Sequence, residues 1–358
     1  MADVLTLHMF IREEHMFKSI ALAVGVAAIV ATATQTIAQD YPEVTLRMAH
    51  PLPETWPAVQ WDKWWAEEVT RRSGGKIKID MFWSGQLGGM LEIKNLISSG
   101  AIDLGVFAQA AHASEMPMTS VAAGLLNRVS ADAATAQKLA GEVYASAPTK
   151  AELDELNLHP IKWTVTSPYR LTCNKAIEQM SDLEGLRVRA VGGAYVPIWM
   201  ETYGMVPTQI QAPEIREGLQ RGTLDCNFGP IEWVPFFSLQ SVAPFVSDIN
   251  TGTFTTFQLF APADKWAKWP ESVRNLMTEV AQEAMQKDLE WVAGAEAEAM
   301  ASFAEAGGKM IPLADMDAFV AKSPDMIAIW EEKMTEEGKA EAIAPIVPLQ
   351  RAAAESFN

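Results

Sequence analysis

Hydrophobic residues along this chain follow two alternating patterns. Residues 44–48, 77–81 and 102–106 carry them at every second position, which predicts strands. Residues 61–72 and 88–97 lie between these segments and carry them at helical spacing, with glycines shortly after each stretch. Because consecutive parallel strands need a helical crossover, this order predicts a mostly parallel sheet covered by helices.

The rest of the chain predicts a second unit of the same kind and one long helix. Helices are expected at 133–147, 150–156, 194–203 and 213–221, a strand at 186–190, and extended segments at 161–173, 224–228 and 253–261. Residues 263–307 are helical in pattern almost throughout, interrupted at Pro270, and such a helix is suited to brace two lobes. No Gly/Ser-rich linker separates the halves, so we expect short, ordered crossings between two α/β lobes, as a hinged protein requires.

The first 38 residues have the pattern of an export signal. From Met16 the sequence has a lysine, then an apolar run over 20–31, then small residues up to Ala38, where cleavage is expected. Residues 1–15 carry acidic side chains, the wrong charge for this position, so Met16 is the expected start of the protein. The alternative is a retained membrane anchor, but the run is shorter than the roughly 20 residues that span a bilayer. We expect export to the periplasm and no stable membrane insertion after cleavage.

Composition excludes several classes of partner and site. The chain has 28 Lys and Arg against 45 Asp and Glu, a formal charge of −17, and a pI near 4.8. This field repels phosphate backbones, so no nucleic-acid partner is expected. Five His and two Cys are too few for zinc knuckles or iron–sulfur clusters. The cysteines, Cys173 and Cys226, either form one disulfide, worth about 4 kcal/mol for a loop of about 50 residues, or remain buried thiols.

The chain contains none of the common catalytic motifs. It has no Gly-x-Ser-x-Gly elbow, no phosphate-binding loop, no Gly-x-Gly-x-x-Gly after a strand and no His-Glu-x-x-His. His50 follows the first strand and is placed to face a cleft, although a lone histidine is more often structural. We therefore expect a protein that is not an enzyme, with no catalytic residue, no cofactor and no metal site.

Several motifs resemble those of one protein family. Residues 181–189 read Ser-Asp-Leu-Glu-Gly-Leu-Arg-Val-Arg, and residues 214–225 carry Glu-x-x-x-x-Leu-x-x-Gly-x-x-Asp. Gly-x-Leu-Gly-Gly at 85–89 and Gly-Ala-Ile-Asp at 100–103 agree with them. Over roughly residues 43–310 the chain resembles the solute receptors of tripartite ATP-independent periplasmic (TRAP) transporters. The resemblance implies a periplasmic-binding-protein-like fold, a small organic-acid ligand in a cleft between two lobes, and TRAP membrane subunits as partners.

The resemblance also assigns ligand contacts to two arginines. Family members have an arginine at the position of Arg189 that pairs with the substrate carboxylate, a role suited to a planar, permanently charged guanidinium. Arg187 lies on the same face of the expected strand, so periodicity alone does not choose between them; the resemblance selects Arg189 and leaves Arg187 as a surface charge. Arg170 matches a second ligand-reaching arginine, with a structural ion pair as the alternative.

Departures from the family pattern change the expected ligand. Phe228-Gly229-Pro230 stands where many members have Glu-Asn before Pro, and Arg216 stands where a tyrosine is usual. Loss of these polar groups counts against a four-carbon dicarboxylate and favours one carboxylate or sulfonate with an apolar, aromatic or quaternary-ammonium remainder. The further residues expected at the cleft are Trp199, Trp56, Trp83, Phe228, Trp233 and His50. For each tryptophan the alternative is a place in the core.

These expectations combine into one functional hypothesis. The first lobe is expected to comprise residues 40–164 plus about 251–290, and the second 165–250 plus about 291–358. Together they would capture a small organic acid by hinge closure and deliver it to a TRAP permease. The alternatives are a periplasmic enzyme acting on small organic acids through His50 and a carboxylate, and a receptor for another transport or signalling system.

Overall fold

The computed structural model describes residues 41–122, 126–190 and 193–357. The expected signal segment, residues 1–38 with its start at Met16, lies outside this part of the chain. Within the described ranges, no helix combines the length and hydrophobicity needed to cross a membrane. The described residues form two mixed β-sheets with helices packed against them, which confirms the predicted α/β fold class.

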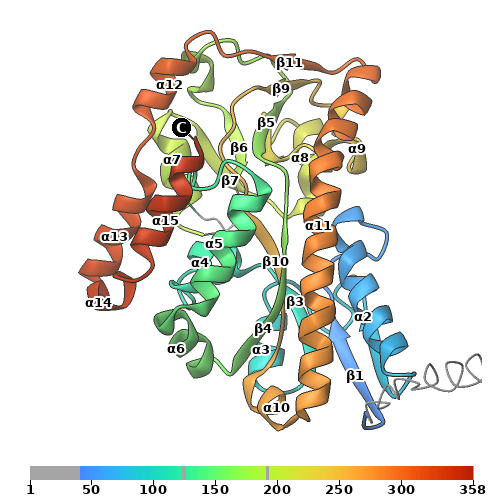
Figure 1. Cartoon of the computed structure of the whole chain (residues 1–358). Coiled ribbons are helices and arrows are strands. Elements are labelled where there is room, and N and C mark those ends of the chain that lie inside the picture. The colour runs from blue at the N-terminus through green and yellow to red at the C-terminus, as the bar shows by residue number, and fades with distance from the viewer. Residues whose placement is uncertain (1–40, 123–125, 191–192, 358) are drawn as a thin grey trace, which may run out of the picture. The chain divides into compact units, whose positions relative to one another are not determined.

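The first sheet contains the three alternating segments at the start of the chain. Its strands are β1 (Val44–Ala49), β2 (Ile77–Phe82), β3 (Leu104–Phe107), β4 (Leu158–Val165) and β10 (Thr255–Pro262), in the order β2-β1-β3-β10-β4 (Figure 1). The first three are parallel, as predicted, whereas β10 runs antiparallel to both of its neighbours. Its helices are α2 (Gln60–Arg72), α3 (Ile93–Ser98), α4 (Thr119–Ala122), α5 (Ala133–Ala145), α6 (Ala147–Glu155) and α10 (Ala263–Lys268).

The second sheet has six strands in the order β11-β9-β5-β8-β6-β7. They are β5 (Tyr169–Cys173), β6 (Arg187–Ala190), β7 (Val206–Gln209), β8 (Cys226–Pro230), β9 (Phe245–Ser247) and β11 (Lys309–Ile311). Here β5 is antiparallel to β8 and β9, and the remaining pairs are parallel. Its short helices are α7 (Tyr195–Thr202), α8 (Ile215–Gln220) and α9 (Trp233–Phe236).

The chain passes between the sheets through short, ordered segments. The predicted extended segment 161–173 is two strands in different sheets, β4 and β5, joined by residues 166–168. The return crossing, between β9 and β10, is hydrogen-bonded to the first: the Tyr169 amide donates to the Gly252 carbonyl at 2.8 Å, and the Thr251 hydroxyl donates to the Tyr169 carbonyl at 2.8 Å. The two crossings are thus joined side by side.

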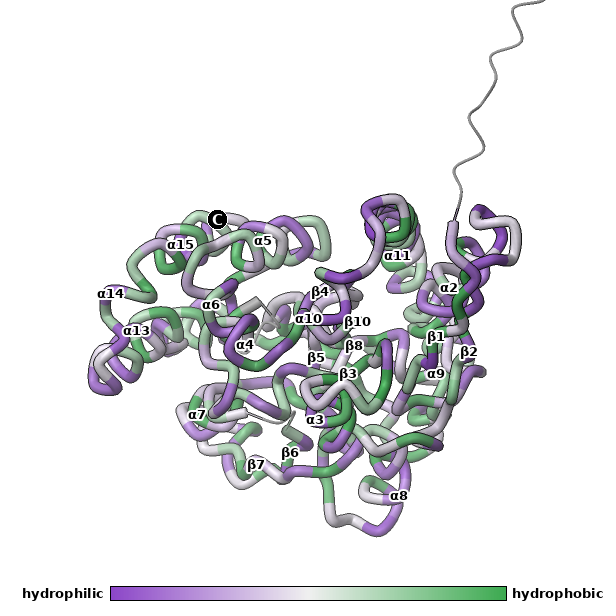
Figure 2. The backbone as a smooth tube through the Cα atoms, turned by 90° about the horizontal axis from the view of Figure 1, so that it is seen from below, coloured by the Kyte–Doolittle hydropathy of each residue, from purple (hydrophilic) through white to green (hydrophobic). Residues whose placement is uncertain are grey.

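A third connection is the long helix α11 (Glu271–Glu305), which begins directly after Pro270. Its buried positions recur every three or four residues, from Val273 to Phe303, so one side of the helix faces the protein along its whole length. It packs on α2 and β4 of the first sheet's layer and on α9 of the second, and it runs beside both sheets in Figure 1. Figure 2 shows hydrophobic and hydrophilic positions mixed around this helix.

The C-terminal helices contact both layers. They are α12 (Met316–Lys322), α13 (Met326–Glu336), α14 (Ala340–Ile343) and α15 (Val347–Ala354). Helix α13 packs on α7, whereas α15 packs on α5, next to the first sheet. Beyond α15, the Ser356 hydroxyl accepts a hydrogen bond from the Ala131 amide at 2.9 Å.

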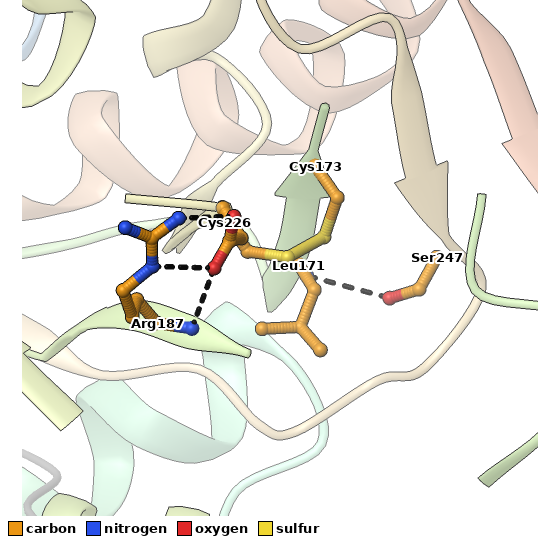
Figure 3. The surroundings of a disulfide bond; sticks show 6 residues. Leu171, Cys173, Arg187, Cys226 and Ser247 are labelled. Carbon is orange, nitrogen blue, oxygen red and sulfur yellow. Dashed lines mark hydrogen bonds and ion pairs between the residues drawn. A yellow bond between two sulfur atoms is a disulfide. The ribbon is translucent and has the colours of Figure 1, made fainter. Parts of the chain in front are cut away.

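A disulfide joins two neighbouring strands of the second sheet. Cys173 of β5 and Cys226 of β8 lie opposite each other in the antiparallel register and are bonded, with their Cα atoms 4.1 Å apart (Figure 3). Both residues are buried. Of the two possibilities left open by the sequence, the structure therefore shows the disulfide.

Removing this disulfide is expected to destabilise the protein. The bond closes a loop with a sequence separation of 53 residues, and cross-linking a loop of that size lowers the entropy of the unfolded chain. The double variant Cys173→Ala, Cys226→Ala is expected to lose about 4 kcal/mol of unfolding free energy, measured by urea denaturation. Wild-type protein treated with dithiothreitol serves as the control, because it should lose a similar amount. An unchanged urea midpoint in both samples would contradict this expectation.

Candidate functional site

A cavity of about 360 Å³ is lined by residues that follow strands of both sheets. Leu52 follows β1 and Ala108 follows β3, whereas Gln209 ends β7 and Trp233 follows β8. Loops at the carboxyl ends of parallel strands are the usual place for ligand sites in open α/β sheets. Next to the two crossings, Tyr169 at the start of β5, Phe254 and the first part of β10 also line the cavity, whereas no residue of the long helix 271–305 does so.

Arg189 is the cation of this cavity. It lies on β6 and is only 6% exposed. Its Nε donates to the Ile210 carbonyl at 3.2 Å, its Nη1 donates to the Phe228 carbonyl at 3.1 Å, and its guanidinium carbon lies 5.3 Å from the centre of the Trp233 ring. These contacts fix the plane of the guanidinium.

The charge of Arg189 has no counterion among the residues that the structure describes. Burial lowers the pKa of the guanidinium, and the nearby Tyr169 opposes this shift, yet an arginine keeps its proton in proteins. Among the described residues, no carboxylate forms an ion pair with it. A guanidinium has five N–H groups, and main-chain carbonyls occupy two of them here. The others remain available to an anion in the cavity.

Aromatic side chains form much of the cavity wall. Tyr169, Trp233, Phe254 and Phe257 all line it. The Tyr169 ring lies 4.5 Å from that of Phe254 and 6.3 Å from that of Trp233, centre to centre, so Tyr169 packs against both of the other rings. Large rings in mutual contact form a rigid, apolar surface.

The polar groups of the cavity are few and mostly neutral. They include the side chains of Gln209, Gln211 and Thr256, and Arg189 is the one charged residue among those that line it in the described part of the chain. No cluster of three or more His, Cys, Asp or Glu side chains that could hold a metal ion occurs within the described residues. The arrangement suits one anionic group and an apolar or weakly polar body.

Two of the predicted ligand contacts, Arg189 and Trp233, line this cavity. The other six do not, and these are Arg170, Trp199, Trp56, Trp83, Phe228 and His50. Arg170 instead has protein partners: its Nη1 donates to the Asp248 carbonyl at 3.0 Å, and its Nη2 pairs with Glu296 at 3.1 Å. This is the structural ion pair that the sequence left as the alternative, and it ties β5 to α11.

Three of the other aromatic residues lie behind the cavity wall. The Trp56 ring lies 5.3 Å from Trp233 and 6.1 Å from Phe257, so it supports two rings that line the cavity. The Phe228 ring packs between Tyr169 and Trp199, while its carbonyl holds Arg189. Trp199 is fully buried in the layer between α7 and β8. The sequence placed them on segments that could meet at the cleft, but it does not show which side chains border the cavity and which lie one layer behind it.

His50 and Trp83 belong to a different part of the first layer. The His50 Nδ1 accepts a hydrogen bond from the Leu52 amide at 3.2 Å, and its Nε2 lies 3.2 Å from an Asp62 oxygen. The ring is completely buried and lies 4.6 Å from the Trp83 ring. His50 therefore holds the main chain at Leu52, which lines the cavity, and does not itself reach it.

Asp62 lies at the centre of a buried ionic cluster. Its carboxylate contacts Lys162 of β4 at 2.5 Å, and both side chains are almost fully buried. Burial alone would raise the pKa of Asp62, but the Lys162 charge and the His50 hydrogen bond together lower it to about 2. Asp62 is therefore ionised in the folded protein, and its charge is balanced by that of Lys162.

Asp288, on α11, is the second carboxyl group of this cluster. One of its oxygens accepts a hydrogen bond from the Val165 amide at 2.9 Å, at the end of β4 where the crossing begins. Burial raises the pKa of Asp288 to about 7, opposed by Lys162 and assisted by the negative charges of Asp62 and Glu232. This carboxyl group links the long helix to the first crossing.

Several cavity residues were not predicted from the sequence. Tyr169 stands next to Arg170, and the strand alternation that turns Arg170 towards α11 turns Tyr169 towards the cavity. Phe254 and Phe257 belong to the extended segment rich in Phe and Thr, which was recognised as a strand but not connected with the cleft. Because the sequence analysis placed Arg170 at the cleft, alternation would have turned Tyr169 away from it; the ion pair of Arg170 with Glu296 fixes the opposite orientation.

Comparison with known proteins gives a consistent result. Residues 48–335 match the model of the DctP family, described as bacterial extracellular solute-binding protein, family 7. A solute-binding protein of Roseobacter denitrificans is 23% identical over 318 residues, which cover 87% of this chain and 92% of the relative. This match extends over nearly the whole described part of the chain.

Two solved structures have a similar fold. The extracytoplasmic solute receptor of Bordetella pertussis that binds pyroglutamic acid has a TM-score of 0.75 at 18% identity, covering 86% of this chain and 99% of that protein. A TRAP periplasmic solute-binding protein from Roseobacter denitrificans with bound β-D-glucuronate has a TM-score of 0.73 at 19% identity, covering 86% and 99%. At these identities the likeness concerns the fold.

The buried Asp288 is expected to make stability depend on pH. The folded protein keeps this proton up to about pH 7, whereas the unfolded chain releases it near its ordinary pKa of 3.8, so its contribution to unfolding free energy falls as pH rises from about 4 to 7. Asp288→Asn keeps an acceptor for the Val165 amide and removes the charge. We expect this variant to be at least about 1 kcal/mol more stable than wild type at pH 8 and similar to it near pH 4, by urea denaturation.

An exposed carboxylate on the same helix provides the control for this measurement. Glu298→Gln makes the same chemical change at an exposed position of α11 and should leave the pH profile unchanged. An Asp288→Asn protein that is less stable than wild type at pH 8 would show that the ionised carboxylate stabilises this cluster, contrary to our interpretation.

Proposed function

The chain belongs to family 7 of the bacterial extracellular solute-binding proteins, and we propose that it is the extracytoplasmic receptor of a TRAP transporter for a small organic acid. Members of this family bind solutes and are not enzymes. The observation that carries the proposal is the uncompensated guanidinium of Arg189 inside a cavity that is otherwise uncharged and largely aromatic. A ligand carboxylate or sulfonate would supply the missing counterion and form charge-assisted hydrogen bonds.

The cavity wall supports one acidic group and an apolar or cyclic body for the part of the ligand that this cavity encloses. Gly229, where many relatives carry Asn, lies between Asn227 and Trp233: a Cβ atom at this position would lie 2.9 Å from the Asn227 amide nitrogen and 3.4 Å from the Trp233 ring. The glycine avoids the close contact with Asn227 and adds no polar side chain next to Trp233. Pyroglutamate, the ligand of the Bordetella receptor, is a ring with a single carboxylate and is closer to this description than the polyhydroxylated glucuronate of the Roseobacter protein.

Binding is proposed to close the two lobes over the ligand. Residues that follow strands of both sheets line the cavity, and the paired crossings with Tyr169 lie beside it. A ligand that contacts both lobes stabilises the closed arrangement relative to the open one, and the difference in contacts shifts the population. The closed form would then be recognised by the TRAP membrane subunits.

The export and lobe assignments remain part of the proposal. Residues 1–38 would direct the protein to the periplasm and be removed there. The lobes would comprise residues 40–164 with about 251–290, and 165–250 with about 291–358. The packing of α15 on α5 adds a contact between the C-terminal residues and the first lobe.

Two measurements test whether an organic acid is bound. Any molecule that co-purifies with the protein is released by denaturation and identified by mass spectrometry, and a panel of organic acids, including pyroglutamate and aromatic and quaternary-ammonium acids, is screened by thermal shift. We expect at least one carboxylate or sulfonate to raise the melting temperature. No stabilisation by any acid, together with a co-purified ligand that has no acidic group, would refute the proposal.

Replacing Arg189 by lysine is expected to weaken binding of the acid found in this way about 30-fold or more, corresponding to about 2 kcal/mol or more. Lysine retains the positive charge but lacks the planar guanidinium, whose several N–H groups can donate to the two carbonyls and to the ligand at the same time. Affinity is measured by isothermal titration calorimetry, and the melting temperature without ligand establishes that the variant is folded.

Arg187→Lys is the matched control. Arg187 lies two residues away on β6, but its side chain is 46% exposed and pairs with Asp225 at 2.8 Å outside the cavity (Figure 3). This variant should bind like wild type. If Arg189→Lys binds as tightly as Arg187→Lys, the acid is held by other groups and the assignment of Arg189 is wrong.

A further inference from the structure

A second hollow, of about 380 Å³, adjoins the cavity of Arg189. Ala110, Ala111, Gly193 and Gln209 line both hollows, so the two lie next to each other at this point. Three of these four residues are glycine or alanine, which leave the passage free of large side chains. We refer to the second hollow as the outer chamber.

The outer chamber has a cation of its own. Lys333 of α13 lines it, with its Nζ 5.5 Å from the centre of the Tyr195 ring, which also lines it. The carboxylate of Glu337 is close in sequence and lines the same chamber, but it pairs with Lys339 at 2.7 Å. Over the residues that the structure describes, Lys333 has no ion pair.

Each hollow is lined by a cation that lies over an aromatic ring. Arg189 lies over the Trp233 ring in the inner cavity, where it is buried, and the exposed Lys333 lies over the Tyr195 ring in the outer chamber. Each cation is without a carboxylate partner of its own in the described chain, although the protein carries a formal charge of −17. Their charges add positive potential to two adjoining hollows of a protein that is acidic as a whole.

We propose that the outer chamber is a second anion subsite, which takes the distal acidic group of an extended organic acid whose first acidic group is bound by Arg189. This inference rests on the proposed function of the inner cavity and adds to it the length and second charge of the ligand. The body of such a ligand passes between Ala110 and Gly193, and its far end meets Lys333 beside the Tyr195 ring.

The test uses unbranched acids of graded length. Straight-chain α,ω-dicarboxylates from succinate to sebacate are titrated into the protein by calorimetry, each beside the monocarboxylate with the same number of carbon atoms. Above the length that spans the two chambers, the wild-type protein is expected to bind the dicarboxylate about fivefold more tightly than its monocarboxylate. Lys333→Gln should remove this preference and leave the affinity for monocarboxylates unchanged.

Lys322→Gln is the matched control. Lys322 is an exposed lysine on the neighbouring helix α12, its Nζ lies 5.7 Å from the centre of the Tyr203 ring, and it lines neither hollow. Its substitution makes the same change of net charge and should leave the preference for the long dicarboxylate intact. If Lys333→Gln weakens all acids equally, the lysine acts only through its long-range field and the subsite does not exist.

The outcomes separate this inference from the proposed function. Monocarboxylates that bind in an Arg189-dependent manner, with no preference for dicarboxylates of any length, would overturn the subsite and leave the receptor assignment intact. Absence of binding by every acid in both series, together with a negative thermal-shift screen, would overturn both. A preference for long dicarboxylates that survives in Lys333→Gln would place the second acidic group elsewhere.

Discussion

A buried positive charge without a counterion among the described residues is the constraint around which this cavity is organised. Moving a charged group out of water is costly unless other groups replace its hydration. Arg189 is partly compensated by two main-chain carbonyls and the face of the Trp233 ring, which orient it but leave its charge without an ion pair in the described part of the chain. An anion in the cavity would supply the missing counterion, which is the physical basis of the proposed selectivity for acids.

The surrounding structure keeps other charges away from this cation. Arg187, on the same strand, is neutralised by Asp225, and Arg170 is neutralised by Glu296. The buried Asp62 is paired with Lys162 rather than with an arginine. Each of these ion pairs also joins separate elements of the fold. The same contacts therefore stabilise the scaffold and leave Arg189 as the charged cavity residue without an ion pair among the described residues.

The fold could be read from the sequence because its signals are local. The β-α-β-α-β pattern at the start, the long helix after Pro270 and the strand carrying Arg189 all depend on spacing within a few residues, and the structure contains them. The antiparallel β10 was not foreseen as antiparallel, because its direction depends on the return crossing rather than on its own pattern. The disulfide needed the register of β5 against β8, a long-range pairing that the spacing of Cys173 and Cys226 does not specify.

The site was harder to predict than the fold because a side chain's distance from a cleft is a tertiary property. Arg189 and Trp233 line the cavity, but Trp56 and Phe228, one layer behind it, carry the same sequence signal as residues that line it. Their burial is still relevant to binding: Trp56 packs against Trp233 and Phe257, and the Phe228 carbonyl orients the guanidinium. An aromatic residue behind the wall therefore limits how far the wall can move. Rigidity of this kind reduces the ordering that binding must otherwise supply, so under the proposed function the aromatic residues behind the wall would contribute to affinity through those that line it.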